Sequence, residues 1–449
     1  MSSFTGAPET ISDFVFDTVL FTSPFLDRSI ELKNNVTDLE IFEDLNFPYL
    51  TGRIMLVDDS GFLTNADVIG GETIFIKITC SSKDAKPFSK TFYISEILST
   101  SKVNEISEGH IFNLIEDIGF ESNLQNLNKS YNGKCGTIIE KIASNFLNKD
   151  ITKFGVDTQS VKLIVPNLSP IEAMMWIRDR ATTINGYPFY LFSTLITDTL
   201  KYVDLGTLIN TPVINPDVPY RYSSTPFFSD DETAKRRILL GFDQNEINNL
   251  YRYIQRGLIG AQYEYIDTVK NRRNTFQFDV TKDLLDPLVK NSVLPRNQNN
   301  IMYGPRYKLN EKPYNQLSSR KITRIGGSSA YVDQTSFNSY KESELLSDYK
   351  NNVTSQAMKE LLANAPITFA VKGLDFIGGE EHSTVGNNLR IHFTFPNPDP
   401  TLADQLLDQK KSGDYLIFAT HHTFKKDTDT FKHYVKMTGS KLANYTDIV

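Results

Sequence analysis

The side chains best suited to metal binding or acid–base chemistry gather near the end of the chain. Five of the six histidines lie in the last seventy residues, namely His382, His392, His421, His422 and His433. Imidazole nitrogens are common metal ligands, and His421 and His433 would face each other across a predicted closing hairpin. No fixed ligand spacing accompanies them, and the Glu-Glu-His run at 380–382 is not a His-Glu-x-x-His motif. Histidines at a barrel surface or a subunit interface are therefore favoured over a metal site.

Carboxylates form four short clusters, and none of them selects a catalytic pair. The clusters are Glu43-Asp44, Asp58-Asp59, Asp230-Asp231-Glu232 and Glu380-Glu381. A glycosidase needs two carboxylates at a fixed separation across a cleft. The Asp58-Asp59 pair precedes Ser60-Gly61 at a predicted strand end, where turn chemistry explains it.

The remaining candidates for chemistry have structural interpretations. The basic clusters at 235–237 and 272–273 favour a solvated face or an ion pair over phosphate binding. Met174, Met175 and Trp176 are expected to pack in a core. The chain has no Gly-x-Ser-x-Gly motif and no Gly-x-Gly-x-x-Gly motif, and the Gly-Lys at 133–134 lacks the other residues of a phosphate-binding loop. No catalytic, cofactor-binding or metal residue is assigned, and we expect a protein that is not an enzyme and has no cofactor.

Composition narrows the class of protein. The 449 residues predict about three domains, with 40% apolar and 12% aromatic residues to fill their cores. Forty-seven basic residues against 54 acidic ones give a formal charge of −7, which argues against a chain-wide nucleic-acid footprint. Two cysteines exclude a disulfide framework. The sequence shows neither a signal peptide nor an apolar stretch of membrane-spanning length, so we expect a soluble, non-exported chain without stable membrane insertion.

Hydrophobic periodicity predicts an α+β, mainly β fold in which α/β modules intervene between two antiparallel β-barrels. The first barrel covers residues 1–116, with seven short strands, and an α/β module covers 117–210. The second barrel is split between 236–282 and 366–449, around an inserted irregular and helical module at 283–365.

Three helices are predicted, over residues 136–148, from 170 onward and over 340–363. The middle helix begins at Ser169 as N-cap, with Pro170 at its first position and Glu172 completing a capping box. It is expected to end at Asn185-Gly186.

An internal repeat is indicated by two matching stretches. Residues 68–78 resemble 384–393, since both place a glycine-containing turn before an alternating strand. The hairpin at 93–115 resembles the hairpin at 415–437. If the repeat is real, the chain carries two related barrels; chance similarity between strand-turn-strand segments is the alternative.

Three passages resemble the hub proteins of contractile phage tail baseplates. They are the strand run from Leu39 to Gly61 followed by Ile69-Gly-Gly-Glu, the helix-to-strand module from Val165 to Tyr190, and the last hairpin from Gly413 to Met437. The middle passage is also similar to the N-terminal part of type VI secretion spike proteins. The chain shows no oligonucleotide-fold barrel, β-helix or lysozyme module of the fused relatives, so the resemblance implies that the spike is a separate chain.

The resemblance implies a structural protein of the virion tail baseplate, assembled in the host cytoplasm. Three copies would form a homotrimer whose six related barrels join the hexameric tail tube protein to the trimeric central spike protein, beside the baseplate wedge proteins. The ring would surround a passive DNA channel during genome ejection, without sequence-specific DNA binding. From the net charge we expect an acidic lumen that repels phosphates. A cell-wall-degrading carboxylate hydrolase and a receptor-binding tail protein are the alternatives.

Overall fold

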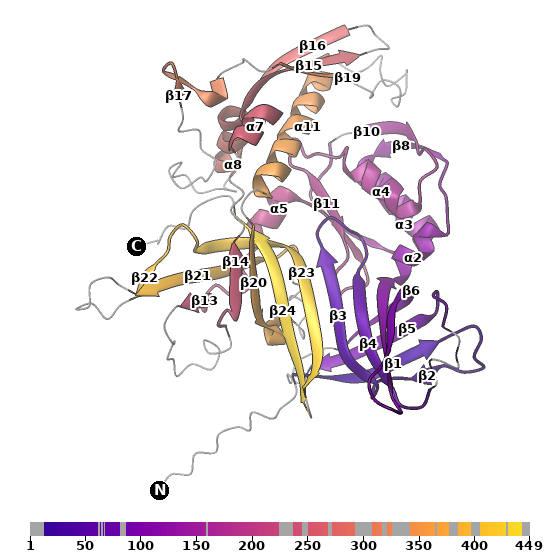
Figure 1. Ribbon diagram of the computed structural model, residues 1–449. Helices are drawn as coiled ribbons and strands as arrows, with labels where there is room; N and C mark the ends of the chain where they lie inside the picture. The colour runs from indigo at the N-terminus through magenta and orange to yellow at the C-terminus, as the bar shows by residue number, and fades with distance from the viewer. Residues whose placement is uncertain are drawn as a thin grey trace.

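The structure is a computed structural model in which part of the chain is described. The described residues run from 13 to 441 apart from gaps at 62, 64–65, 67, 81–86, 159, 224–236, 245–249, 268–271, 292–307, 317–320, 326–341, 364–365, 377–384, 397–404 and 428–429. A large antiparallel sheet fills the lower part of Figure 1, and most helices lie above it. The mainly β, α+β prediction is confirmed.

The N-terminal strand set contains the seven strands predicted within residues 1–116. They are β1 (Phe14–Thr22), β2 (Ile30–Glu31), β3 (Val36–Asp44), β4 (Thr51–Asp58), β5 (Thr73–Cys80), β6 (Phe88–Lys102) and β7 (Glu108–Glu116). Alternating burial along β3 and β4 turns one face of each strand inward. The inward residues form one core that includes Phe14, Leu39 and Phe112.

The C-terminal strand set is built from strands on both sides of an insertion. They are β13 (Tyr220–Ser223), β14 (Gly241–Gln244), β20 (Ile367–Lys372), β21 (Asn388–Pro396), β22 (Gln405–Leu407), β23 (Gly413–Asp427) and β24 (Thr430–Ser440), with a 3-10 turn η4 (Gly373–Phe376). Their apolar faces enclose a second core that includes Phe369, Tyr415 and Val435.

The two sets have the same strand order. The first reads β3-β4-β7-β6-β5-β1, and the second reads β14-β20-β24-β23-β21-β13. The first four neighbouring pairs are antiparallel in both sets, whereas β13 is parallel to β21 and β1 is antiparallel to β5. The equivalent strands include the stretches from which the repeat was predicted, so the strand order agrees with the predicted internal repeat.

Neither set is closed by a ladder between complete strands in the part of the chain that the structure describes. The chain itself bends from one edge to the other. In the first set β2 pairs with β1, and the chain then continues directly into β3 on the opposite edge. In the second set Ile238 bridges to Arg221 of β13 shortly before β14 begins. No closed barrel is therefore found among the described residues, and the two predicted barrels are two open sheets of the same strand order.

The two sets join into one 14-stranded sheet because β3 pairs with β23. Seven residue pairs, from Asp38 opposite Lys425 to Asp44 opposite Ala419, make this antiparallel ladder. We call this ladder the seam. It places the two halves of the chain side by side in one continuous sheet (Figure 1).

The α/β module follows β7 directly. Its elements are α2 (Asp117–Asn123), β8 (Ser130–Lys134), α3 (Cys135–Leu147), β9 (Ile151–Phe154), β10 (Ser160–Ile164), α4 (Pro170–Arg178), β11 (Phe189–Phe192), β12 (Leu200–Asp204) and α5 (Leu205–Asn210). The predicted capping box at Ser169 and Glu172 is present. The prediction that this helix reaches Asn185 was wrong, since α4 ends at Arg178. The β-branched residues Thr182 and Thr183 favour extended backbone, and Thr182 bridges to Pro188.

The insertion separates β14 from β20, at the position where the first set has only the short β3–β4 turn. It contains α7 (Leu250–Arg256), β15 (Gly260–Asp267), β16 (Arg272–Asp279), a π-helix η1 (Thr281–Leu285), α8 (Asp286–Lys290), β17 (Lys308–Leu309), β18 (Lys312–Pro313), η3 (Tyr314–Gln316), β19 (Lys321–Ile325) and α11 (Glu342–Leu362). The helix predicted over 340–363 is confirmed as α11. The strand β15 pairs with β16 on one side and with β19 on the other, in a sheet of their own, whereas residues 236–282 were predicted to belong to the second barrel.

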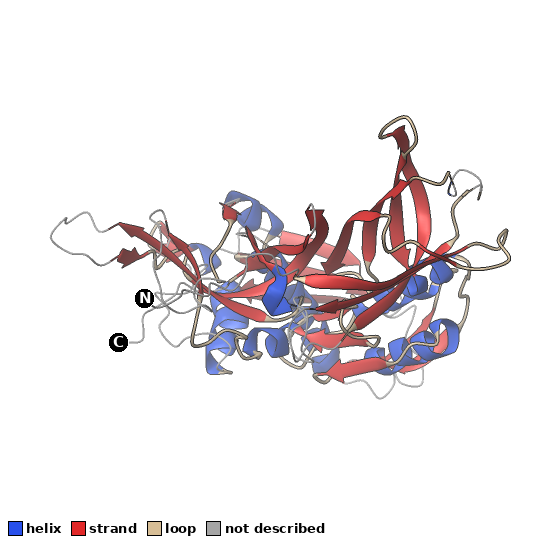
Figure 2. Ribbon diagram, turned by 90° about the horizontal axis from the view of Figure 1, so that it is seen from below, coloured by secondary structure: helices blue, strands red, loops and turns tan. Residues whose placement is uncertain are grey.

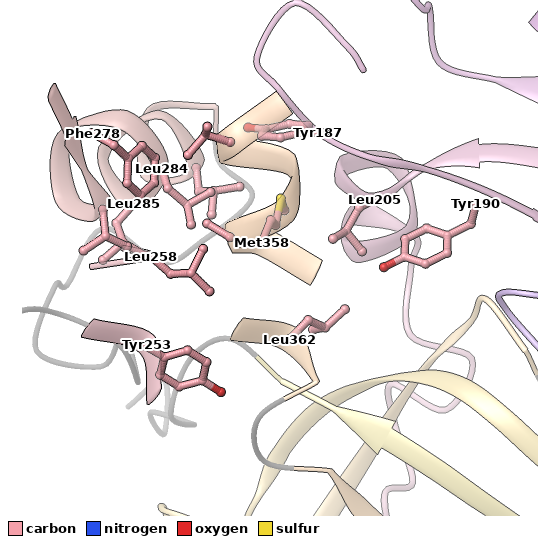
Figure 3. Packing of buried hydrophobic residues seen from close by; sticks show 14 of the residues in the cluster. Tyr187, Tyr190, Leu205, Tyr253, Leu258, Phe278, Leu284, Leu285, Met358 and Leu362 are labelled. Atoms are coloured by element: carbon pink, nitrogen blue, oxygen red, sulfur yellow. The ribbon is translucent and has the colours of Figure 1, made fainter. Parts of the chain in front are cut away.

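A shared core fixes the insertion to the α/β module. Tyr187 and Leu205 of the module belong to the same buried cluster as Leu285 and Met358 of the insertion (Figure 3). Both parts lie at the end of the large sheet where β7 ends and β20 begins. The β6–β7 and β23–β24 turns lie at the opposite end, so the molecule has a hairpin end and a module end (Figure 1). Figure 2 shows the molecule from below, with the strands in red and the helices in blue.

Candidate functional site

The seam contains a buried polar network centred on the Glu43 carboxylate. Glu43 and His422 are each only 1% exposed in their side chains. The carboxylate accepts hydrogen bonds from the Leu195 backbone N–H at 2.6 Å and from Thr420 Oγ1 at 2.6 Å, and it lies 3.1 Å from His422 Nε2. Hydrogen bonds to a buried charge are among the stronger contributions to stability. The network therefore links β3, β23 and the loop after β11 at one point.

His433 extends this network into β24. Its Nε2 lies 3.1 Å from His422 Nδ1, and its ring stacks on Phe424. Burial, together with the charge of His422, holds the pKa of His433 well below the ordinary value of 6.5, whereas the backbone of Gly373 acts in the opposite direction. These contacts hold β3, β23 and β24 together inside the folded sheet.

The predicted approach of His421 to His433 was wrong. His433 lies opposite Phe424 in the β23–β24 ladder, and His421 lies opposite Lys436. The His421 ring points to the other face, where it stacks on Phe42 and lies 3.5 Å from Glu40. Burial lowers the pKa of His421, and the Glu40 carboxylate opposes that shift. In the described ranges no three histidine, cysteine or acidic side chains are grouped to hold a metal ion.

A groove of about 490 Å³ lies on the face of the seam that carries the His421 ring, which we call the open face. Its lining includes Phe47, Tyr49, His421 and Lys436. The charged side chains on this face of the four central strands are Asp38, Glu40, Asp44, Arg53, Lys425, Asp427, Lys432 and Lys436. Acidic and basic groups nearly balance, and Glu40 pairs with Arg53. The acidic lumen stays a prediction, because a single chain does not define which face lines a ring.

The other predicted groups have structural partners. Asp58 accepts hydrogen bonds from the backbone and hydroxyl of Ser60 and from the Leu63 N–H, as predicted for a turn. Arg273 forms an ion pair with the buried Glu264. Met174 is fully buried in the core of the α/β module.

A few further predictions can be placed only in part. His392 lies on β21, half-buried. Arg237 donates to the Val218 carbonyl at 2.8 Å. The residues 230–232, 235–236 and 380–382 lie outside the described part of the chain.

One strand edge stands out that the sequence did not reveal. Along β6, residues Ser95 to Lys102 are exposed, and within the described ranges they pair only with β7. An unpaired edge presents backbone donors and acceptors to another strand. The sequence signal for this edge is the length of β6, because β6 extends beyond the end of its partner β5.

No helix within the described ranges has both the length and the apolar character to cross a bilayer. No protein-family description matches the chain, and no curated protein sequence matches it.

Solved structures do match over almost the whole chain. A 43 kDa tail protein of prophage MuSo2 from Shewanella oneidensis aligns with a TM-score of 0.50 and 8% identity, over 95% of this chain and 98% of that one. A tail protein from Neisseria meningitidis MC58 aligns with a TM-score of 0.49 and 11% identity, over 95% and 97%. The c3393 protein of E. coli, a type VI secretion component, aligns with a TM-score of 0.40 and 8% identity, over 95% and 77%. The chain has the fold of the Shewanella tail protein, which confirms the resemblance to tail proteins at the level of fold.

Proposed function

We propose that this chain is the structural hub of a contractile phage tail baseplate. Three copies form a ring that joins the hexameric tail tube to the trimeric central spike and surrounds the passage for DNA. The observation that carries the proposal is the repeated strand order within one continuous sheet, in a chain with the fold of a prophage tail protein. The site of action is the virion tail, and the role is structural.

The repeat supports the match between three-fold and six-fold symmetry. Each copy supplies two strand sets with the same order, so three copies supply six similar sheets around one axis. A six-fold tube protein then meets six similar surfaces, while the spike meets a three-fold one. Neither contact has to break its own symmetry.

The two ends of the molecule differ in a way that supports contacts with two different partners, the tail tube and the spike. Among the described residues, the hairpin end carries the β6–β7 and β23–β24 turns, one from each strand set, so it presents a similar surface six times in the ring. The module end carries the α/β module and the insertion once per copy, which suits the trimeric spike. We assign the hairpin end to the tail tube, the module end to the spike and the outer surface to the baseplate wedge proteins.

The balanced charge of the open sheet face bears on the channel. Acidic and basic side chains alternate there, as with Glu40 beside Arg53 and Asp38 near Lys425. Such a surface offers DNA no continuous basic track to bind. If this face lines the ring, it lets DNA pass without holding it. The low affinity for DNA then comes from the pairing of neighbouring acidic and basic side chains rather than from a net negative charge.

The two alternatives find less support among the described residues. A hydrolase needs two carboxylates that share an open cleft. Glu43 is instead enclosed by its donors, and Asp58 closes a turn. A receptor-binding protein has no need for two sheets of the same strand order in one chain. A loss of turbidity by purified cell walls on addition of the chain would favour the hydrolase.

Light scattering coupled to size-exclusion chromatography tests the proposal. Since one chain has a mass of 51.0 kDa, the hub predicts a species of about three times that mass, alone or with the spike protein. A mixture with the tail tube protein should elute earlier still. A monomer that fails to trimerise even with the spike protein would contradict the hub.

A further inference from the structure

A hollow of about 500 Å³ lies at the module end and shares no lining residue with the groove on the seam. Its walls come from the turn before β11, from α5 with its flanking residues, and from Asn291 directly after α8. The α/β module and the insertion therefore both contribute to it. Sites for small molecules commonly have volumes of about 300–1,000 Å³. We call this hollow the module pocket.

Uncharged polar side chains dominate the lining of the module pocket. They are three asparagines and three threonines, namely Asn185, Asn210, Asn291, Thr183, Thr207 and Thr211. Asp204 supplies the one carboxylate, and among the described residues that line the pocket there is no lysine, arginine or histidine. A lining of this kind suits a ligand that is polar and carries no negative charge.

Hydrogen bonds fix the two most buried polar side chains of the pocket. Asp204 is 5% exposed, and its carboxylate accepts bonds from the backbone N–H and the hydroxyl of Thr207, 3.1 and 2.5 Å long. The ring of Tyr187 lies in the core between the module and the insertion (Figure 3), and its hydroxyl accepts from Asn291 Nδ2 at 3.2 Å. A Cβ atom on Gly206 would come within 2.5 Å of the Tyr187 ring and 3.0 Å of Asp204, so a glycine is needed to let these two side chains lie together.

Both buried groups keep capacity for further hydrogen bonds. A carboxylate can accept about four, and Asp204 receives two from Thr207. Burial raises the pKa of Tyr187; the bond from Asn291 opposes this shift, and the Asp204 carboxylate adds to it. The phenol therefore keeps its proton and can donate it. The pocket offers a ligand one charged acceptor and one donor on rigid side chains.

The amides of Asn185 and Asn210 are available to a ligand. Both residues are exposed, and among the described residues neither amide has a hydrogen-bond partner. Each amide can donate two hydrogen bonds and also accept. Asn185 lies on an ordered turn, because Gly186 has a φ of 79° and its N–H donates to the Thr183 carbonyl at 2.9 Å.

We propose that the module pocket binds a neutral carbohydrate of one or two sugar rings. Sugar hydroxyls both donate and accept hydrogen bonds, as the amides and the phenol do, and they carry no charge that Asp204 would repel. An anion finds no basic side chain in the lining, and an apolar ligand would leave Asp204 and Tyr187 without partners. An extended peptide would instead need a strand edge or a long groove. This site goes beyond the proposed structural function and does not depend on it.

Saturation-transfer NMR on the full-length chain tests the site. The probes are the neutral disaccharides maltose, cellobiose, lactose and N,N′-diacetylchitobiose, with glucuronic acid as the charged counterpart. At least one neutral disaccharide should receive saturation from the protein, and glucuronic acid should not. Transfer to none of the neutral probes, or to glucuronic acid alone, would overturn the proposal.

Asparagine variants locate the binding. Asn185→Ala and Asn210→Ala each remove one uncharged hydrogen-bonding group, so each should raise the Kd of the bound disaccharide about threefold to tenfold. The matched control is Asn126→Ala, an exposed asparagine outside the pocket, and its Kd should equal that of the unaltered chain. Because all three side chains are exposed, the midpoints of urea unfolding should agree, which separates a lost contact from misfolding. An unchanged Kd in the double variant Asn185→Ala with Asn210→Ala would overturn the proposal.

The spike protein distinguishes a carbohydrate site from a protein contact. If no sugar binds and the double variant loses the spike protein while the unaltered chain retains it, the pocket is a contact with the spike and the carbohydrate site is overturned. A chain that stays monomeric with the spike protein but binds a neutral disaccharide would contradict the hub and support the pocket.

Discussion

The Glu43 network at the seam makes the sharpest prediction about stability. The substitution Glu43→Gln keeps the shape of the side chain and removes its charge. The bonds from the Leu195 N–H and Thr420 Oγ1, both 2.6 Å long, and the contact with His422 at 3.1 Å then lose their anionic acceptor. One of the two carboxylate oxygens also becomes an NH2 group that faces donors.

The magnitude follows from these three contacts. A hydrogen bond to a charged group contributes about 1.5–3 kcal/mol, against about 0.5–1.5 kcal/mol for a neutral pair. Two hydrogen bonds that lose their charged acceptor, and one donor that now faces another donor, together lower the free energy of unfolding by roughly 3 kcal/mol. The side chain is almost wholly enclosed, so water cannot take over the lost contacts.

The substitution Glu40→Gln is the matched control. Glu40 lies on the same strand, and its side chain is 27% exposed and pairs with Arg53 at 3.7 Å. Such a surface pair contributes about 0–1 kcal/mol. Urea unfolding of the three proteins at one concentration, pH 7.5, should therefore lower the midpoint clearly for Glu43→Gln and hardly for Glu40→Gln. Equal midpoints for the two variants would refute the reasoning about the seam.

Three further predictions concern other parts of the chain. Burial keeps the pKa of His433 well below 6.5 in the folded chain, whereas in the unfolded chain this histidine binds a proton near pH 6.5. The free energy of unfolding should therefore fall as the pH drops below about 6.5. In urea titrations from pH 7.5 to 5.5, His433→Gln should lose up to about 1.4 kcal/mol per pH unit of that slope, and an unchanged slope would argue against a neutral buried His433. Lys90→Met leaves the buried Glu116 carboxylate without the ammonium that lies 3.0 Å away. It should lower the free energy of unfolding by about 3–5 kcal/mol in urea, and a loss under 1 kcal/mol would contradict this ion pair. Ser169→Ala removes the N-cap of α4 and should cost about 1 kcal/mol in the same assay, and an unchanged midpoint would speak against the capping box.

Local signals predicted most of the secondary structure. The capping box at Ser169 involves residues three apart, and the helix of 342–362 has its own periodicity, so both could be read from the sequence. The strand repeat was also visible, because glycine turns and alternating strands recur in both halves. The end of α4 was misplaced because the apolar spacing continues to Ala181, whereas the β-branched Thr182 and Thr183 favour extended backbone and Thr182 bridges to Pro188.

The seam could not be predicted because it depends on register. Glu43 meets Leu195 and His422, which are 152 and 379 residues away. The pairing of β23 with β24 also shifts between Ile417 and Ala419, and this irregularity helps to decide which residue faces His433. A register difference of a few residues moves each side chain to another partner or to the other face. Residue types alone indicate neither the shift nor the contact between the halves.

Electron cryomicroscopy of the purified full-length chain tests the central claim most directly. The account predicts a closed ring of three copies, with six sheets of the same strand order around one axis and the hairpin turns at one end. A monomer, or a closed assembly in which the two strand sets of each copy lie at different distances from the axis, would contradict it.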